Sequence, residues 1–467
     1  MLDIKSILKV ISSNFIVLVS GIIITFILPK MVTPLQYGYY SLFNLYVSYA
    51  GITLLGYVDG IYLKYGGKSY EKLNKEEFST YFWKIIIWEI VFLVIASLII
   101  ICSQSGEKLN VLLFTAFGVM LECASSYFMN IDKMTSRFSI YAKENVLYKV
   151  LIFIFIIICL LFKIKIYEYL FFGLIIFKII TLIYQMYNSR KIIFTKPNLI
   201  KKEYFKYDLE NIKVGSILMI SLVCTMLMTG FGKFLVESKL GIEQLGYYSF
   251  MFSIMSLFTL IINSVSTVLY PQMRNMTLER SSQLTESINK VIELIAPFVL
   301  LCYYPCVILI FAFFKSYINT IDCLLFLFPI IIIQTKISII YNNYYKVMRK
   351  EKNMLVNTAI SILICIIITI IGFKLSPSIG TVALSTFISY KIWEIINLVY
   401  FRKNKYLKIK YIGLSDIIIV LYFVLMRIFA TNMIIQALLM LTIYILVLIY
   451  NRKNIKKILS IMKERGN

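Results

Sequence analysis

Four acidic side chains inside or beside long apolar segments are the groups of this sequence best suited to proton or cation chemistry. A charge within an apolar span is costly and usually faces a cavity or a partner, so each one is a functional candidate. The chain contains no His, so proton transfer near neutral pH would have to use carboxylates. For Glu89 and Glu122 the alternative is packing against a polar neighbouring helix. We predict four coupling-ion candidates: Glu89, Glu122, Glu237 and Asp59.

Basic side chains form a second candidate set. Lys178 and Lys336 are single amines deep in apolar segments, where an anionic head group would find a compensating charge. Lys233 lies four residues before Glu237, so both project from one helical face and can pair. This pair either holds helices together or lines a cavity. Lys and Arg outnumber carboxylates within the apolar segments, which favours an anionic cargo.

The apolar segments that hold these residues are long enough to cross a membrane. The chain of 467 residues is 60% hydrophobic and only 15% charged, whereas about a quarter of a soluble domain is charged. A spanning helix needs about 20 apolar residues. The sequence therefore predicts an all-α integral membrane protein. Its fourteen expected spans are 10–30, 37–58, 81–103, 109–131, 147–163, 167–187, 213–235, 245–269, 291–314, 322–344, 354–374, 379–401, 412–430 and 433–451.

The distribution of Lys and Arg predicts the orientation of these spans. Connections rich in basic residues, such as 59–80 and 402–411, alternate with connections that hold one or two. Basic residues mark the cytoplasmic side, so we expect both termini to be cytoplasmic. The net charge of +24 follows from this topology and from anionic lipid, and no nucleic-acid partner is expected.

A repeated hexapeptide indicates a duplicated chain. QYGYYS at 36–41 and QLGYYS at 244–249 differ at one position and enter the second and the eighth span. Six spans per repeat give parallel repeats, a plan used by transporters with alternating access. We therefore predict two parallel six-helix lobes, 1–187 and 213–401, around a central cavity. The cytoplasmic linker 188–212 joins them, and 402–467 adds a helix pair and a cytoplasmic tail.

Several classes of protein are excluded by what the sequence lacks. The eight Cys lie in or beside apolar segments and no His completes a metal site, so they are interpreted as small buried hydrophobes. Neither a phosphate-binding loop nor a dinucleotide fingerprint is present. The connections predicted to be external are too short to form a catalytic domain. We expect no enzyme activity and no cofactor, with an H⁺ or Na⁺ gradient as the energy source.

Two stretches resemble the bacterial Wzx-type polysaccharide repeat-unit flippases of the multidrug/oligosaccharidyl-lipid/polysaccharide exporter superfamily. The first is GYVDGIYLKYGGK at 56–68, in which Gly66 and Gly67 should end the helix. The second is 212–275, which includes GFGKFLVE at 230–237. Many relatives have Asp where this chain has Gly232. The resemblance adds Lys64 and Asn263 to the candidate residues of the cavity, beside Lys233, Lys178 and Lys336.

The resemblance implies a function. The protein would move an oligosaccharide linked by pyrophosphate to undecaprenol from the cytoplasmic to the outer leaflet of the bacterial plasma membrane. Basic side chains would neutralise the pyrophosphate, and an ion gradient would drive the step. Expected partners are membrane lipids and, at the outer face, a polysaccharide polymerase and a chain-length regulator. Two alternatives stay open: a multidrug or small-molecule cation antiporter of the same superfamily, and a lipid II flippase.

Overall fold

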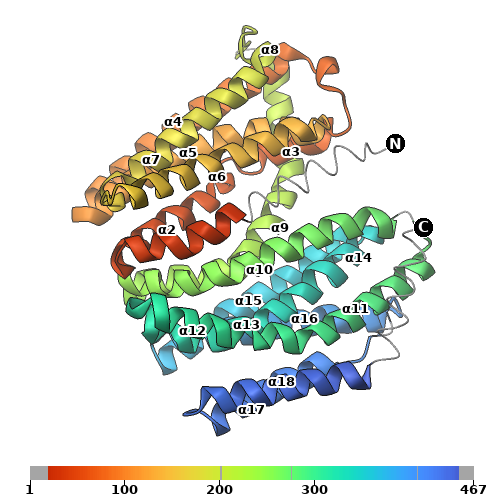
Figure 1. Ribbon diagram of the computed structural model, residues 1–467. Helices are drawn as coiled ribbons and strands as arrows, with labels where there is room; N and C mark the ends of the chain where they lie inside the picture. Colours follow the sequence, from red (N-terminus) through yellow and green to blue (C-terminus); the bar gives the residue numbers. More distant parts are fainter. Residues whose placement is uncertain (1–18, 200–201, 275, 408, 452–467) are drawn as a thin grey trace. The chain divides into compact units, whose positions relative to one another are not determined.

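Every described element of secondary structure is helical. The computed structural model describes residues 19–199, 202–274, 276–407 and 409–451, and no strand occurs among them (Figure 1). The chain forms two compact units, Met1–Phe250 and Met251–Asn467. The predicted all-α class is therefore confirmed for the described residues. The predicted division at 187 and 213 stays a prediction.

The N-terminal unit contains most of the candidate residues. A helix over Val19–Met31 precedes the labelled elements. Thr33 and Gln36 form a capping box at the start of α2, with Pro34 at the first helical position. The elements of this unit are α2 (Pro34–Ser48), η1 (Ala50–Ile52), α3 (Tyr57–Tyr65), η2 (Tyr70–Lys72), α4 (Lys75–Ser103), α5 (Gly106–Met134), α6 (Phe138–Leu161), α7 (Ile166–Asn188), α8 (Arg190–Ile193), α9 (Lys202–Leu240) and the first residues of α10 (Ile242–Arg274).

The C-terminal unit begins within α10. Its other elements are α11 (Leu278–Leu301), α12 (Tyr303–Phe313), η3 (Lys315–Thr320), α13 (Ile321–Thr335), η4 (Lys336–Tyr341), α14 (Asn342–Val347), α15 (Glu351–Leu375), α16 (Ile379–Lys403), α17 (Leu414–Ile428) and α18 (Met433–Tyr450). The element η4 is a π-helical turn between α13 and α14. Such turns are rare and are frequent at functional sites.

The predicted spans are confirmed in kind but not in number. Eleven described helical segments are long and apolar enough to cross a membrane, and a bent twelfth is formed by α2 and α3. The first predicted span begins in residues 10–18, outside the described residues. The thirteenth corresponds to α17, whose 15 residues extend about 22 Å at 1.5 Å per residue, less than the ~30 Å of a bilayer core. The predicted cytoplasmic ends also lie outside the described residues.

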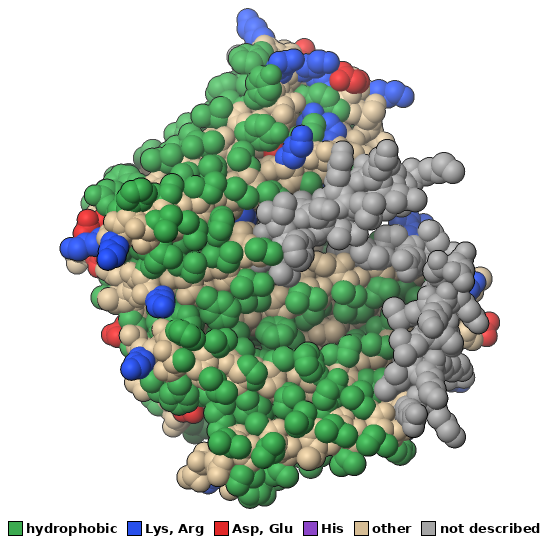
Figure 2. Space-filling model, viewed as in Figure 1, with side chains coloured by type: hydrophobic (Ala, Val, Ile, Leu, Met, Phe, Trp, Pro, Cys, Tyr) green, Lys and Arg blue, Asp and Glu red, His purple; other side chains and the backbone are tan. Residues whose placement is uncertain are grey.

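The surface of these helices is that of a multi-pass membrane protein. On α4 the large apolar side chains Leu98, Ile99 and Ile101 are more than half exposed. Figure 2 shows hydrophobic side chains over most of the visible face, with charged side chains mainly near the ends of helices. In water such a surface would aggregate, whereas lipid covers it without cost.

The second predicted span is broken rather than continuous. Its two parts, Pro34–Ile52 and Tyr57–Tyr65, are bent by 55°. Leu55 and Gly56 at the break both have left-handed backbone, with φ of 51° and 82°, which a right-handed helix cannot contain. Gly56 also touches α9, because a Cβ there would lie 2.5 Å from the carbonyl carbon of Gly215. At the other end of α3, Gly67 is left-handed with φ of 87°, so the predicted glycine termination is confirmed.

The two copies of the hexapeptide pack against each other inside the N-terminal unit. Each begins at the third residue of its helix, α2 or α10. A Cβ on Gly38 of the first copy would lie 2.0 Å from the carbonyl oxygen of Ile242, and a Cβ on Gly246 of the second copy would lie 2.0 Å from that of Pro34. Both glycines are thus required by close backbone approach. The contact is reciprocal, because the glycine of each copy meets the first residue of the helix that holds the other copy.

Candidate functional site

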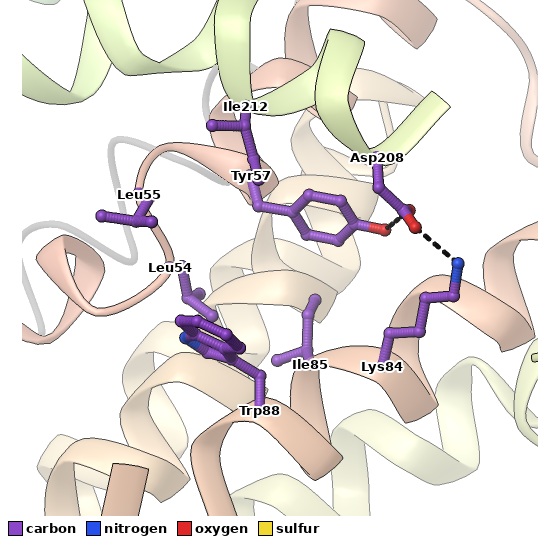
Figure 3. A pocket seen from close by; sticks show the side chains of 8 residues that line it. All are labelled: Leu54, Leu55, Tyr57, Lys84, Ile85, Trp88, Asp208 and Ile212. Carbon is purple, nitrogen blue, oxygen red and sulfur yellow. Dashed lines mark hydrogen bonds and ion pairs between the residues drawn. The ribbon is translucent and has the colours of Figure 1, made fainter. Parts of the chain in front are cut away.

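A pocket lies beside the break in the second span (Figure 3). It has a volume of about 170 Å³. The break, α3, α4 and α9 all contribute to its wall, and the bend between α2 and α3 positions three of the eight lining residues. The lining residues are Leu54, Leu55, Tyr57, Lys84, Ile85, Trp88, Asp208 and Ile212.

One end of the pocket is charged. The Tyr57 hydroxyl donates to Asp208 Oδ1 at 2.5 Å, and Lys84 Nζ donates to Asp208 Oδ2 at 2.5 Å. The two dashed lines in Figure 3 show both contacts converging on one carboxylate. The Lys84 and Asp208 side chains are 22% and 16% exposed, so an anion could reach the ammonium group only by competing with Asp208.

The rest of the pocket is apolar and aromatic. Leu54, Leu55, Ile85, Ile212 and the ring of Trp88 form this part of the lining (Figure 3). The Trp88 indole donates from Nε1 to the Thr53 carbonyl oxygen at 2.8 Å, which fixes the ring against the break. An apolar wall with a charged end suits a molecule that carries both kinds of group, such as a lipid near its phosphate.

Glu89 follows Trp88 and is the most secluded of the predicted carboxylates. It is fully buried and is the fifteenth of the 29 residues of α4. Thr53 Oγ1 lies 2.6 Å from Glu89 Oε1. Oε2 is buried, and within the described part of the chain it has no hydrogen-bond partner. No basic side chain in the described residues forms an ion pair with Glu89, which sets it apart from the next two candidates.

Glu122 and Glu237 are both neutralised by lysine in this unit. Glu122 of α5 pairs with Lys178 of α7 at 2.6 Å. The structure thus joins a predicted coupling carboxylate to a predicted cargo cation. Glu237 of α9 pairs with Lys108 of α5 at 2.7 Å. Lys108 is therefore the ion-pair partner seen for Glu237, where the helical spacing had indicated Lys233.

The remaining predicted residues of this unit are spread over several helices. Lys64, at the end of α3, pairs with Glu210 of α9 at 2.8 Å, and its ammonium lies 4.4 Å from the ring centre of Tyr207. Asp59 is half-buried in the first turn of α3. Lys233 is half-buried on α9. None of these three is among the residues that line the pocket in Figure 3.

The C-terminal unit holds a chain of buried ion pairs. Lys336, at the start of the π-helical turn, lies 3.0 Å from Glu394 of α16, and both side chains are about 5% exposed or less. Glu394 also pairs with Lys391 at 2.6 Å, and Lys391 reaches Asp416 of α17 at 2.5 Å. We call these four residues the ion-pair chain. The predicted cargo cation Lys336 is thus already compensated, while Asn263 lies exposed on α10.

Sequence reasoning missed the pocket and one end of the ion-pair chain. Asp208 is in the polar stretch 188–212 that was predicted as a linker, whereas the structure places it in α9, which begins at Lys202. Lys84 is near the start of the predicted span 81–103 and was not among the predicted site residues. The sequence signal was that α4 places Lys84, Trp88 and Glu89 within two helical turns. Asp416 is near the start of the predicted span 412–430 and was not among the predicted site residues.

Comparison with known proteins bears on this arrangement. The polysaccharide biosynthesis protein family matches residues 4–277, more than half of the chain. No curated protein sequence matches. Among solved structures, the lipid II flippase MurJ in an inward closed conformation is similar over 97% of this chain and 100% of that chain, with a TM-score of 0.66 and 16% identity.

Transporters of a second kind share the fold. A multidrug resistance MATE family transporter of the MOP superfamily, in an inward-facing conformation, is similar over 85% of this chain and 98% of that chain, with a TM-score of 0.61 and 13% identity. A Vibrio cholerae MATE transporter is similar over 86% of this chain and 98% of that chain, with a TM-score of 0.55 and 11% identity. At these identities the similarity shows the fold, which is that of membrane transporters and not of enzymes. The chain belongs to the polysaccharide biosynthesis protein family, as its resemblance to Wzx-type flippases predicted.

Proposed function

We propose that this protein moves undecaprenyl-pyrophosphate-linked oligosaccharide repeat units from the cytoplasmic to the outer leaflet of the bacterial plasma membrane. The observation that carries the proposal is the family match over residues 4–277. The similarity to a lipid II flippase along nearly the whole chain adds support, because that fold serves a lipid-linked cargo. The polymerised product would be a surface polysaccharide.

The proposed mechanism is alternating access between two equivalent halves. The reciprocal contact of Gly38 and Gly246 with the first residues of the opposite helix is the contact that a duplicated chain would make. It supports two parallel six-helix lobes and an added C-terminal helix pair. In such a plan the sugar head group passes between the lobes while the lipid tail stays in the bilayer.

The charges inside the spans fit an anionic cargo. Lys178, Lys336 and Lys64 each have a carboxylate partner within 3.0 Å. A pyrophosphate entering the cavity would have to displace these carboxylates from the lysine ammonium groups. Lys84, at the charged end of the pocket, is a further candidate, and its partner Asp208 stays hydrogen-bonded to Tyr57 when the lysine leaves. Energy would come from an H⁺ or Na⁺ gradient.

Cells that lack the protein test the cargo. Lipid extracts should accumulate the pyrophosphate-linked repeat unit, and the surface polysaccharide should be lost. A chain with Lys233→Ala or Lys84→Met should restore less surface polysaccharide than the wild-type chain does, whereas Lys165→Met, on an exposed pair with Glu168, should restore it fully. Normal lipid intermediates and normal polysaccharide in a cell with no second flippase would contradict the proposal.

The lipid II flippase is the second candidate, favoured by the TM-score of 0.66 with MurJ. Loss of the protein would then stop peptidoglycan synthesis and kill the cell, and lipid II would accumulate. The multidrug antiporter is the third candidate, and it predicts changed drug sensitivity with normal lipid intermediates.

A further inference from the structure

Glu89 is placed where an ionised carboxylate is least stable. It is at the middle of α4, which is 29 residues long and the most apolar of the candidate spans among the described residues. Its side chain has no exposed surface, and one of its oxygens has no hydrogen-bond partner. Burying a carboxylate without a cation or a full set of donors is strongly unfavourable, and such a group usually takes up a proton instead.

The hydrogen bonds around Thr53 contain one hydrogen too few for an ionised Glu89. Thr53 Oγ1 lies 2.6 Å from Glu89 Oε1 and 2.8 Å from the Ala50 carbonyl oxygen. A hydroxyl has one hydrogen and can donate it once at a time. Both contacts are within hydrogen-bond range, so a second hydrogen is needed between these three oxygens. A protonated Glu89 supplies it: Glu89 donates to Thr53, and Thr53 donates to Ala50.

The unpartnered oxygen agrees with this count. In a neutral carboxylic acid the charge is absent, and the second oxygen is a carbonyl that tolerates a missing donor far better than a carboxylate oxygen does. The Cys123 thiol is next to this cluster, 3.4 Å from Thr53 Oγ1, but its single hydrogen is donated to the Ala50 carbonyl oxygen at 3.3 Å. The proton on Glu89 is therefore the simplest way to satisfy the whole cluster.

The turn held by this cluster is the break in the second span. Ala50 begins η1, the turn that precedes the left-handed pair Leu55 and Gly56. The carbonyl oxygen of Ala50 accepts from Thr53 Oγ1 and from Cys123, and the carbonyl oxygen of Thr53 accepts from Trp88. Trp88 of α4 and Cys123 of α5 thus donate hydrogen bonds to the two ends of one turn, at Thr53 and at Ala50.

We propose that Glu89 is a proton-binding site whose occupancy controls the geometry of this break. In the conformation seen here the carboxyl group holds a proton. When the proton leaves to water, the Thr53 hydroxyl turns from Ala50 to the new carboxylate and the turn Ala50–Thr53 loses a hydrogen bond. The proposal rests on the proposed function in one respect, namely that this proton is the coupling ion of the flipping step.

The charged groups around Glu89 do not remove the need for that proton. On its own helix, Lys84 is committed to Asp208 of α9. On α5, the neighbouring Glu122 is committed to Lys178 of α7, and Cys123 is a thiol that donates to a carbonyl. From the break, Thr53 and Ala50 offer only a hydroxyl and a carbonyl. Glu89 consequently responds to its own proton and not to a nearby ion pair.

Infrared spectroscopy of the purified full chain tests the protonation directly. The wild-type spectrum minus the Glu89→Gln spectrum, at neutral pH, should contain the carbonyl stretch of a protonated carboxylic acid. The same subtraction with Glu237→Gln is the control and should show only carboxylate bands, because Glu237 contacts the Lys108 ammonium group at 2.7 Å. A difference spectrum for Glu89 that contains carboxylate bands alone overturns the proposal.

Amide hydrogen exchange tests the link to the break. As pH rises and the acid band disappears, wild-type residues 50–56 should lose protection beyond the intrinsic effect of pH. Glu89→Gln should keep its protection, because the amide nitrogen continues to donate to Thr53. Thr53→Val should make exchange at the break insensitive to the state of Glu89, and Thr53→Ser should restore the sensitivity. Equal pH dependence in all four proteins would show that the break does not sense Glu89.

The choice of ion and the choice of cargo are tested separately. Replacing K⁺ by Na⁺ at constant pH should leave the acid band unchanged, whereas loss of the band on addition of Na⁺ would identify a sodium site and overturn the proton assignment. Neither spectrum nor exchange requires a substrate. If they behave as expected while cells lacking the protein show normal lipid-linked intermediates, the proposed cargo fails and the proton site stands.

Discussion

One buried acid in each unit shows a different way of accommodating charge. In the C-terminal unit the ion-pair chain links Lys336, Glu394, Lys391 and Asp416 through contacts of 2.5–3.0 Å. In the N-terminal unit Glu89 is equally buried but has no ion pair in the described residues, and its neighbours are a hydroxyl, a thiol and backbone. The first arrangement neutralises charge by pairing. The second is stable only if the carboxyl group carries a proton.

This difference separates structural from switchable charge. A buried ion pair is held because removing either partner leaves the other uncompensated, so the chain resists changes of protonation. A lone acid has no partner to lose, and its proton can enter or leave as the surroundings open to water. We therefore assign the ion-pair chain to holding η4, α16 and α17 together, and Glu89 to responding to the ion gradient.

Glu394→Gln should have the largest effect on stability, because it removes the one carboxylate that contacts both lysines. Lys336 would stay buried but lose the carboxylate that it contacts at 3.0 Å, and we expect a loss of about 3–5 kcal/mol in the free energy of unfolding. Unfolding in mixed detergent micelles measures it. Glu168→Gln, on an exposed pair with Lys165, is the control and should change little. A small loss for Glu394→Gln would show that the ion-pair chain is not structural.

Lys84→Met should have an intermediate effect, because its pair with Asp208 is only partly buried. Asp208 keeps the hydrogen bond from Tyr57, so the loss should be about 1–2 kcal/mol, the size of a charge-assisted hydrogen bond. The same unfolding assay measures it. Lys84→Arg should retain most of the stability. If Lys84→Met lowers the free energy of unfolding as much as Glu394→Gln does, the Lys84–Asp208 pair is structural, like the ion-pair chain.

Replacing both members of the Lys336–Glu394 pair should cost less than replacing one. In Lys336→Met with Glu394→Gln, no unpaired charge remains beside the π-helical turn, and Lys391 keeps Asp416. We expect a free energy of unfolding within about 1–2 kcal/mol of the wild-type value. The double-mutant cycle gives the coupling energy directly. Additive losses from the two single changes would contradict the pairing argument.

The sequence predicted the elements better than the contacts between them. Apolar blocks and the Lys and Arg pattern located the helices, and the hexapeptides located two helix starts that do meet, at Gly38 and Gly246. The break at Leu55 and Gly56 could not be predicted, because its signal is one glycine in an apolar run and its cause is the backbone of α9 at Gly215. Charge patterns show which residues need a partner but not which partner they meet.

Individual residues make the same point about the site. Glu89, Glu122 and Glu237 looked alike in the sequence, since each is an acid within an apolar block. The structure distinguishes them through residues far away in the chain: Lys178 lies 56 positions from Glu122 (178 minus 122), and Lys108 lies 129 positions from Glu237. Only the fold could show that Glu89 has no such partner. The physical reason is that pairing depends on helix packing, which one sequence does not specify.

Glu89→Gln should cost the least stability, although it makes the same chemical change as Glu394→Gln. A neutral amide can donate to Thr53 as the protonated acid does, so at a pH low enough to protonate Glu89 in both the folded and the unfolded chain the free energy of unfolding should change by less than about 1 kcal/mol. As pH rises above the ordinary range of a glutamate, only the wild-type chain must take up a proton on folding, so the variant should become progressively more stable than the wild-type chain until the folded Glu89 also ionises. Unfolding of both proteins over a range of pH measures this divergence. If Glu89→Gln instead costs as much as Glu394→Gln, Glu89 is a compensated carboxylate, and the contrast between the two units disappears.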